Sequence, residues 1–600
     1  MVILEKLSSS RPLLLLLLLS GAGIIALMII QPPHEKIAIV GSTFGLLLFL
    51  IAVYFLDDRE CSLVPTLTRQ WLRYVPLTIG ISVNIFASWA PPPITAFALA
   101  GAIALLFPLS RLVNISKVYV ASLTVFLAGS AAYNVFSHYP PVNGIDPWRY
   151  LSVASAIMRG GHYSNVEQPT DMYYFAFPVM SIASSILSSV AGLDLRFSIL
   201  LFPGFLILLQ PLLVFLLSRI VFHDNKVAAL SAFIVVTEAE VTRWMNAPIA
   251  QSAAISLLLL LLIVLFRQAR SRGNVVVALV VFLMLVALHG AVGFVSVILV
   301  SYLIMREGSL YKGMISPLVA ILLGYWMITA AIDRMIRGAE VNLTYILEFI
   351  FTPTLRTGGE LYGAGSNGLI FVWWGMPVSL ALLSILVQRR KRVSTWAYAG
   401  LGLLGLSFGV SVMVPNLDVD RYGGLAAWLF LAVAGGKALS TLSRSSRKLL
   451  MLIPIMFLVC LSAVANPSLS PQYGYGRPGP ELPTTETDRA ALDWVNEHVT
   501  KSLLADSHSA RYLTFTRYQS GVFSTRGIDY LIPYYQWELI EPTPTPDRAL
   551  FVRWGDVAAK YNGGEGCGLT LVVATQEKHQ TIGILYNNGC DVLEANALWM

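Results

Sequence analysis

Asp146 is the residue whose position in this sequence most clearly suggests chemistry. It precedes Pro147, so we expect it to cap a helix that has the proline at its first position and ends at Gly160-Gly161. A carboxylate held rigidly at a helix N-terminus can act as a general base or as a metal ligand. The alternative is that Asp146 only caps a surface helix.

Other ionisable residues are scattered through a chain that contains few of them. Only 12% of the residues are charged, about half of the ~25% usual in soluble proteins. Ionisable groups near a membrane-embedded cavity are energetically costly and by default suggest function. The candidates besides Asp146 are Glu238, Glu240, Arg243, His289 and Arg421.

The elements that must position these residues are apolar helices. Hydrophobic residues make up 56% of the 600 residues, and most of the first 465 lie in apolar runs of membrane-spanning length, which excludes a chain of soluble domains. We predict a polytopic α-helical membrane protein. Its fifteen expected spans lie near 12–30, 37–56, 75–89, 94–110, 118–137, 197–218, 227–240, 249–266, 275–289, 291–305, 314–331, 369–388, 395–414, 421–439 and 449–465.

The distribution of charge predicts the orientation of these spans. Residues 1–465 carry a net charge of +12, and residues 466–600 carry −5. The basic run 389–392 and the cluster Arg444, Arg447 and Lys448 belong on the cytoplasmic side. The N-terminus is then cytoplasmic and the acidic tail extracytoplasmic, in a multi-pass protein of the cell membrane. The positive charge is explained by loop orientation, so we expect no nucleic-acid partner. The alternative for Leu13–Leu19 is a signal peptide.

Two segments affect the number of crossings. In residues 176–192, five serines from Ser181 to Ser189 share one face of a helix and apolar residues share the other, which predicts an amphipathic helix on the outer surface rather than a span. The apolar runs 275–289 and 291–305 are short and are interrupted at His289-Gly290. They are expected either to cross incompletely or to form a hairpin that dips into a cavity.

The hydrophilic tail is predicted to be a small α/β domain, residues 486–600, after a linker at 466–485. We expect a helix over Thr487–Val499 and a hairpin at Asn588-Gly589. Cys567 and Cys590 could form a disulfide bond if the tail faces an oxidising compartment. The expected strands are Ser502–Ala505, Ala549–Val552, Leu569–Ala574 and Thr581–Tyr586.

The order of these elements resembles that of the GT-C integral-membrane glycosyltransferases. A span is followed by Gly-x-Asp, a short helix ending in Gly-Gly, a proline-led surface helix and the run RFSILLFPGFLILLQPLLVFLLSRIVF. The resemblance implies a catalytic acidic residue in the loop 138–172, which is Asp146. It makes residues 118–465 the catalytic core, with interfacial helices in its outer loop 138–196, and residues 1–117 an N-terminal addition. Phe177-Pro178-Val179 stands where many members have His-Pro-Pro.

The same resemblance gives roles to the other ionisable residues. Glu238 and Glu240 stand where members carry a second acidic motif, and with Asp146 they could hold Mg²⁺ or Mn²⁺. The alternative is a polar turn. Arg421, in an Asp-Arg-Tyr sequence, would bind the phosphate of a lipid carrier, as would His289 and Arg243. The alternatives are an ion pair for Arg421 and a hydrogen-bonded structural histidine.

The activity implied by the resemblance is inverting transfer of one sugar from a polyprenyl- or dolichyl-phosphate donor. The acceptor would be a glycan, a protein or a lipid on the outer face of a prokaryotic, archaeal membrane. The lipids of that membrane are further expected partners. One alternative is en bloc transfer of a preassembled glycan, as in oligosaccharyltransferases or polymerases, but the tail lacks their Trp-Trp-Asp-Tyr-Gly motif. The other alternative is a transporter or flippase, which predicts paired broken helices in repeated halves.

Overall fold

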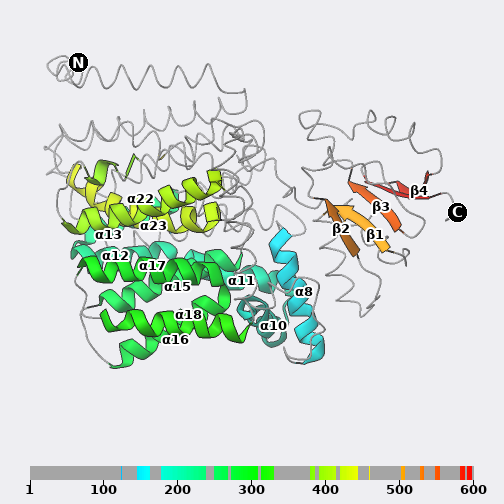
Figure 1. Ribbon diagram of the computed structural model, residues 1–600, viewed down its shortest axis with the longest axis horizontal. Helices are drawn as coiled ribbons and strands as arrows, with labels where there is room; N and C mark the ends of the chain where they lie inside the picture. The colour runs from blue at the N-terminus through cyan, green and yellow to red at the C-terminus, as the bar shows by residue number, and fades with distance from the viewer. Residues whose placement is uncertain are drawn as a thin grey trace, which may run out of the picture. The chain divides into compact units, whose positions relative to one another are not determined.

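A computed structural model describes the chain in separate stretches, which fall into two compact units (Figure 1). Each unit is described by itself below. The described residues are 123, 145–161, 177–237, 249–267, 272–307, 312–329, 379–380, 382–385, 391–413, 419–442, 459, 502–506, 528–532, 548–553, 582–587 and 591–596.

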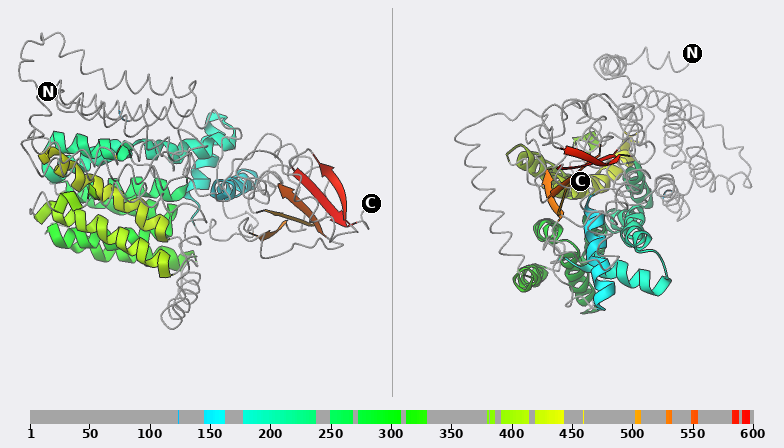
Figure 2. Two further views of the ribbon diagram at one scale, coloured as in Figure 1. Left: turned by 90° about the horizontal axis from the view of Figure 1, so that it is seen from above. Right: turned by 90° about the vertical axis from the view of Figure 1, so that its right-hand side faces the viewer.

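One unit is a bundle of apolar helices that lie roughly alongside one another (Figures 1 and 2). Helix α13 is enclosed by the others, since every residue from Val227 to Thr237 is buried. The helices are α12 (Gln210–Phe222), α13 (Asn225–Thr237), α15 (Ala250–Phe266), α16 (Arg272–Leu288), α17 (Gly290–Glu307), α18 (Ile315–Ile328), α22 (Lys391–Met413) and α23 (Val419–Leu442), with a short 3₁₀ turn at Lys312–Met314.

Glycines allow helices of this bundle to pack at very short distances. A Cβ atom at Gly436 of α23 would lie 2.7 Å from the backbone nitrogen of Ser231 and 2.8 Å from the carbonyl oxygen of Val227, both in α13. A Cβ atom at Gly400 of α22 would lie 2.6 Å from Cγ of Leu431 in α23. Small residues at helix contacts are typical of bundles in membranes, where backbones approach closely.

The turn between α12 and α13 is fixed by its own residues. His223 has φ 53°, in the left-handed region, and its N–H donates to the carbonyl of Arg219 to close α12. Asp224 then caps α13, because its Oδ1 accepts hydrogen bonds from the backbone N–H groups of Lys226 at 2.9 Å and Val227 at 3.3 Å. The two helices therefore reverse direction within two residues.

The predicted spans can be compared with the structure where residues are described. Eight predicted spans, from 197–218 to 314–331 together with 395–414 and 421–439, coincide with described helices. Within the described residues, Leu195–Phe222 is long and apolar enough to cross a bilayer, and seven further apolar helices are shorter. The number of crossings therefore stays a prediction. The five spans predicted before residue 138 and the one at 449–465 lie almost wholly outside the described residues, and the span at 369–388 is described, as helix, only at 379–380 and 382–385.

The second unit contains helices α8 (Ile145–Gly160) and α10 (Val179–Ala191), the beginning of α11 (Leu195–Leu208), and a five-stranded sheet. The strand order is β2-β1-β3-β5-β4; β1 is parallel to β2 and β3, and β5 is antiparallel to β3 and β4. The strands are β1 (Ser502–Asp506), β2 (Ile528–Ile532), β3 (Arg548–Arg553), β4 (Ile582–Asn587) and β5 (Asp591–Asn596).

Three of the four predicted strands are confirmed as β1, β3 and β4, and the predicted hairpin at Asn588-Gly589 joins β4 to β5. The prediction missed β2 and β5. Strand β5, Asp-Val-Leu-Glu-Ala-Asn, has too few consecutive apolar residues to be recognised without its neighbours. The predicted helix at Thr487–Val499, the strand at Leu569–Ala574, and both Cys567 and Cys590 lie outside the described residues.

Candidate functional site

Helix α8 carries Asp146 in its first turn. The helix begins at Ile145 and ends at Gly160, and Gly161 follows with φ 73°. The predicted end is therefore confirmed, but the predicted start is wrong, because Asp146 is the second helical residue and does not precede the helix. Pro147 does not prevent the earlier start, since N–H groups of the first turn have no partner within the helix. A carboxylate in this turn is still favoured by the helix dipole.

Helix α10 buries most of its serines, and two of them contact α8. Ser181, Ser184, Ser185 and Ser188 are all buried, whereas Val190 on the other face is 83% exposed. The predicted serine face is confirmed for four of its five members, whereas Ser189 is exposed. The location of this helix on the outer surface of a membrane stays a prediction. The pattern resembles helices in a membrane environment, where small hydroxyl residues contact other helices and apolar residues face outward.

Two hydroxyls of α10 are hydrogen-bonded to the backbone of α8. Ser181 Oγ donates to the carbonyl of Tyr150 at 3.0 Å, and Ser185 Oγ donates to the carbonyl of Ala154 at 3.0 Å. The donor and acceptor are 31 residues apart in both pairs, and the two pairs are one helical turn apart along each helix. The two helices therefore run in the same direction. Phe177 lies two residues before the start of α10. Phe177 belongs to the motif that replaces His-Pro-Pro, and it is 4% exposed.

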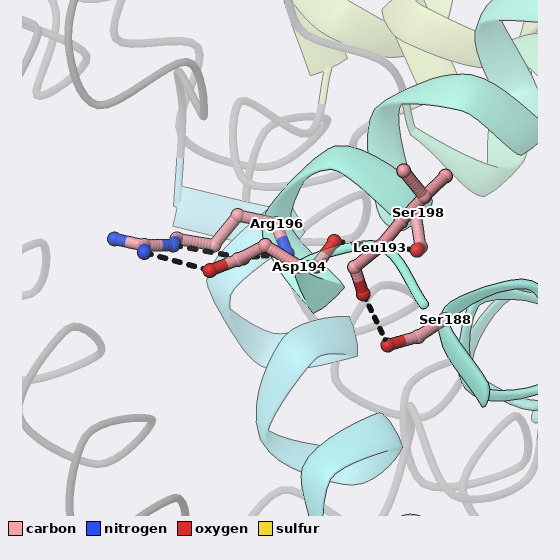
Figure 3. Close-up of polar contacts among 5 residues, drawn as sticks. All are labelled: Ser188, Leu193, Asp194, Arg196 and Ser198. Atoms are coloured by element: carbon pink, nitrogen blue, oxygen red, sulfur yellow. Dashed lines mark hydrogen bonds and ion pairs between the residues drawn. The ribbon is translucent and has the colours of Figure 1, made fainter. Parts of the chain in front are cut away.

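The corner between α10 and α11 is held by short polar contacts (Figure 3). Gly192 ends α10 in the left-handed region with φ 64°. Ser188 Oγ donates to the carbonyl of Leu193 at 2.7 Å. Asp194 accepts from the backbone N–H of Arg196 at 2.7 Å and from its guanidinium at 3.0 and 2.8 Å. This pair is not among the predicted site residues, although an aspartate before an apolar run is a cap signal.

Beyond that corner, an apolar stripe follows the exposed side of α11. Phe197 is 39% exposed, Leu201 50% and Phe205 63%. These residues are four apart and therefore share one side of the helix. Leu195–Phe222 contains 28 residues and is long and apolar enough to cross a bilayer. The segment contains Pro203 and is interrupted at Leu209, between α11 and α12.

His289 lies at a sharp turn between α16 and α17. A Cβ atom at Gly293 would be 3.4 Å from Cα of Val286, so the two helices double back and form a hairpin. The predicted position of this hairpin in a cavity stays a prediction. They contain 17 and 18 residues, about 26 and 27 Å. His289 is 6% exposed, and its Nδ1 accepts from the N–H of Val292 at 3.5 Å. This contact is that of a helix cap.

The remaining predicted site residues are placed only in part. Arg421 is the third residue of α23, in its first turn. Asp146 belongs to one unit, and His289 and Arg421 belong to the other. Glu238, Glu240 and Arg243 lie outside the described residues. In the part of the chain that the structure describes, no three His, Cys, Asp or Glu residues form a group able to hold a metal ion.

A buried polar contact that was not predicted lies between α12 and α15. Gln210 is 3% exposed, and its Nε2 donates to the carbonyl of Ser252 at 3.3 Å and to Oγ of Ser256 at 3.1 Å. Serines at positions 252 and 256 share one face of an apolar helix, and that spacing was the available signal. The contact lies within the bundle and fixes one helix against another.

Comparisons with known proteins were made by sequence and by structure. No model of a known protein family matches the chain, and no curated protein does. Among solved structures, it is similar to the Archaeoglobus fulgidus oligosaccharyltransferase tethered with an acceptor peptide, at 14% identity and a TM-score of 0.46, covering 81% of this chain and 75% of that one.

The chain is also similar to ArnT from Cupriavidus metallidurans. For the apo state, the identity is 12% and the TM-score 0.47, covering 80% of this chain and 98% of that one. For the form bound to undecaprenyl phosphate, the identity is 11% and the TM-score 0.46, covering 79% of this chain and 97% of that one. Identities and TM-scores this low assign neither a family nor a reaction to the chain.

Proposed function

We propose that this chain is an integral-membrane glycosyltransferase of the GT-C type, with Asp146 as its catalytic residue. The observation that carries the proposal is the placement of Asp146 in the first turn of α8, a helix fixed to α10 by buried hydrogen bonds. A carboxylate on a helix whose backbone is held in this way would suit the role of a general base, which must be kept at a fixed position relative to its substrate.

The proposed reaction is displacement at the anomeric carbon of a polyprenyl-phosphate sugar. The carboxylate of Asp146 takes the proton from an acceptor hydroxyl. The acceptor oxygen bonds to the anomeric carbon as the bond to the carrier phosphate breaks, and the lipid phosphate leaves with the electron pair. Attack from the opposite side inverts the anomeric configuration.

Arg421 is the proposed partner of the lipid phosphate, with His289 and Arg243 as further candidates. The guanidinium of Arg421 would offset the negative charge that develops on the leaving phosphate. This effect is strongest where water is excluded. Asp146, Glu238 and Glu240 are all carboxylates, a ligand type suited to Mg²⁺ or Mn²⁺. Such an ion would supply additional positive charge for the phosphate.

The proposed location is the cell membrane, with the N-terminus in the cytoplasm and the site open to the outside. The fifteen predicted spans place residues 486–600 on the same side as Asp146. The acceptor is then an extracytoplasmic glycan, protein or lipid. The high apolar content and the basic predicted inner loops support this orientation.

The test is an assay of membranes containing the full chain with a panel of polyprenyl-phosphate sugars. Asp146→Asn is expected to reduce transfer by at least about 10²-fold, because a neutral amide cannot accept the proton. The control is Asp194→Asn, which removes a carboxylate from the neighbouring corner and should leave transfer close to wild type. Transfer by Asp146→Asn at the wild-type rate would contradict the proposal.

A second set of donors separates single-sugar transfer from en bloc transfer. The panel should include lipid-diphosphate oligosaccharides alongside lipid-monophosphate monosaccharides. Single-sugar transfer predicts product only with the monosaccharide donors. Product only with the oligosaccharides would favour the en bloc alternative, and lipid translocation without any product would favour a flippase.

A further inference from the structure

The buried hydroxyls of α10 differ in what they bond, and that difference suggests a role. Ser181 and Ser185 reach carbonyl oxygens of α8, whereas Ser184 donates only within its own helix in the described contacts, to the carbonyl of Met180 at 2.8 Å. Ser181 and Ser184 are both 0% exposed, and Ser185 is 4% exposed. Burial alone therefore does not explain why two of these serines face α8.

The two contacts fix both the position of α8 along its axis and the direction of that axis relative to α10. A single hydrogen bond would allow α8 to rotate or tilt about it, but two bonds one turn apart also set its direction. Sliding by one residue would move each carbonyl about 1.5 Å along the axis and about 100° around it, out of reach of the hydroxyls. Ser185 also lies 2.8 Å from the carbonyl of Ser181, so its single hydroxyl hydrogen is shared between two acceptors.

Asp146 continues the line of residues held by these contacts. Asp146, Tyr150 and Ala154 are spaced four apart and lie along one side of α8. The contacts to Tyr150 and Ala154 therefore fix the backbone one and two turns below the proposed base. A shift of about 1 Å in a catalytic group can reduce a rate by about 10²-fold.

We infer that Ser181 and Ser185 are positioning residues that hold Asp146 in place through the backbone of α8. This inference rests on the proposed function, because it assumes that Asp146 is the base. The two serines do not touch substrate. They set the height and the rotation of the helix that carries the carboxylate.

The experiment compares Ser181→Ala, Ser185→Ala and the double variant with Ser184→Ala, all in the full chain. Each change removes one buried hydroxyl from the same helix face, so Ser184→Ala is a control matched for burial and helix propensity. The double variant is expected to lower kcat about 10- to 100-fold, with the KM for the lipid donor unchanged. Ser184→Ala should keep a wild-type kcat.

Hydrogen–deuterium exchange supplies a readout that does not depend on turnover. Peptides covering 150–160 should exchange faster in the double variant than in Ser184→Ala, because α8 has lost its two contacts. Equal kcat and equal exchange in the double variant and the control would overturn the inference. Asp146→Asn is assayed in parallel: if it retains wild-type transfer, the proposed function fails, and the positioning role fails with it. Loss of transfer in Asp146→Asn, with no difference between the serine variants, overturns the positioning role alone.

Discussion

Lys437 of α23 lies 3.8 Å from the carboxylate of Asp224, the residue that caps α13. Its Nζ is also 6.0 Å from the centre of the Phe222 ring at the end of α12. One side chain therefore contacts the turn that joins two helices far from it in sequence. Asp224 provides a helix cap and an ion pair at once, so its loss should be more harmful than the loss of Lys437.

This asymmetry can be measured by substitution. Asp224→Ala should lower the free energy of unfolding by about 1–2 kcal/mol through loss of the cap, and Lys437→Met by less than about 1 kcal/mol. Arg219→Met, at an exposed position in the last turn of α12, is the control and should have little effect. Thermal unfolding in detergent checks the order. A larger loss in Lys437→Met than in Asp224→Ala would contradict it.

Gly436 is predicted to tolerate no larger side chain. Its Cβ position lies within 3 Å of the backbone of α13, and backbone atoms cannot rotate away as a flexible side chain can. Gly436→Ala should lower the free energy of unfolding by about 1–3 kcal/mol through overpacking. The measurement is the unfolding midpoint of the purified protein.

Gly402 of α22 is the matched control for that substitution. A Cβ atom there would meet nothing within 4 Å. Gly402→Ala should therefore raise stability by about 0.5–1 kcal/mol, the usual gain in helix propensity. If both alanine variants shift the midpoint in the same direction, the close approach of α13 and α23 does not limit the size of residue 436.

Cys567 and Cys590 are predicted to form a disulfide bond, which would fasten the hairpin that begins with β4. Removing a native disulfide from a small extracytoplasmic domain typically costs about 2–5 kcal/mol. Protein alkylated in intact cells and digested without reduction should give one cross-linked peptide containing both cysteines. Recovery of both as free, alkylated thiols would reject the bond.

The sequence was sufficient to locate helices but not to orient their faces. The stretch 249–266 was predicted as a span and is α15, Ala250–Phe266, because a continuous apolar run has few other stable conformations. The serine stripe of α10 was recognised, but its pattern is the same whether the hydroxyls face water or the carbonyls of another helix. Contacts between distant segments, such as that of Asp224 with Lys437, leave no pattern in the local sequence and could not be predicted from it.

Two glutamines of the bundle should respond oppositely to replacement by leucine. Gln210 donates to both Ser252 and Ser256. Gln251 is 2% exposed, and its Nε2 has no hydrogen-bond partner among the described residues. Losing satisfied buried hydrogen bonds costs stability, whereas removing an unsatisfied buried amide removes a desolvation penalty.

Gln210→Leu is therefore expected to lower the free energy of unfolding by about 1–2 kcal/mol, and Gln251→Leu to leave it unchanged or raise it by about 1 kcal/mol. Both substitutions replace an amide with an apolar side chain of similar size, so each serves as the control for the other. The measurement is the unfolding midpoint of each variant compared with that of the wild type. Equal losses in both would mean that the amide of Gln251 is hydrogen-bonded in the folded protein, most simply to a buried water, and that burial alone does not distinguish the two sites.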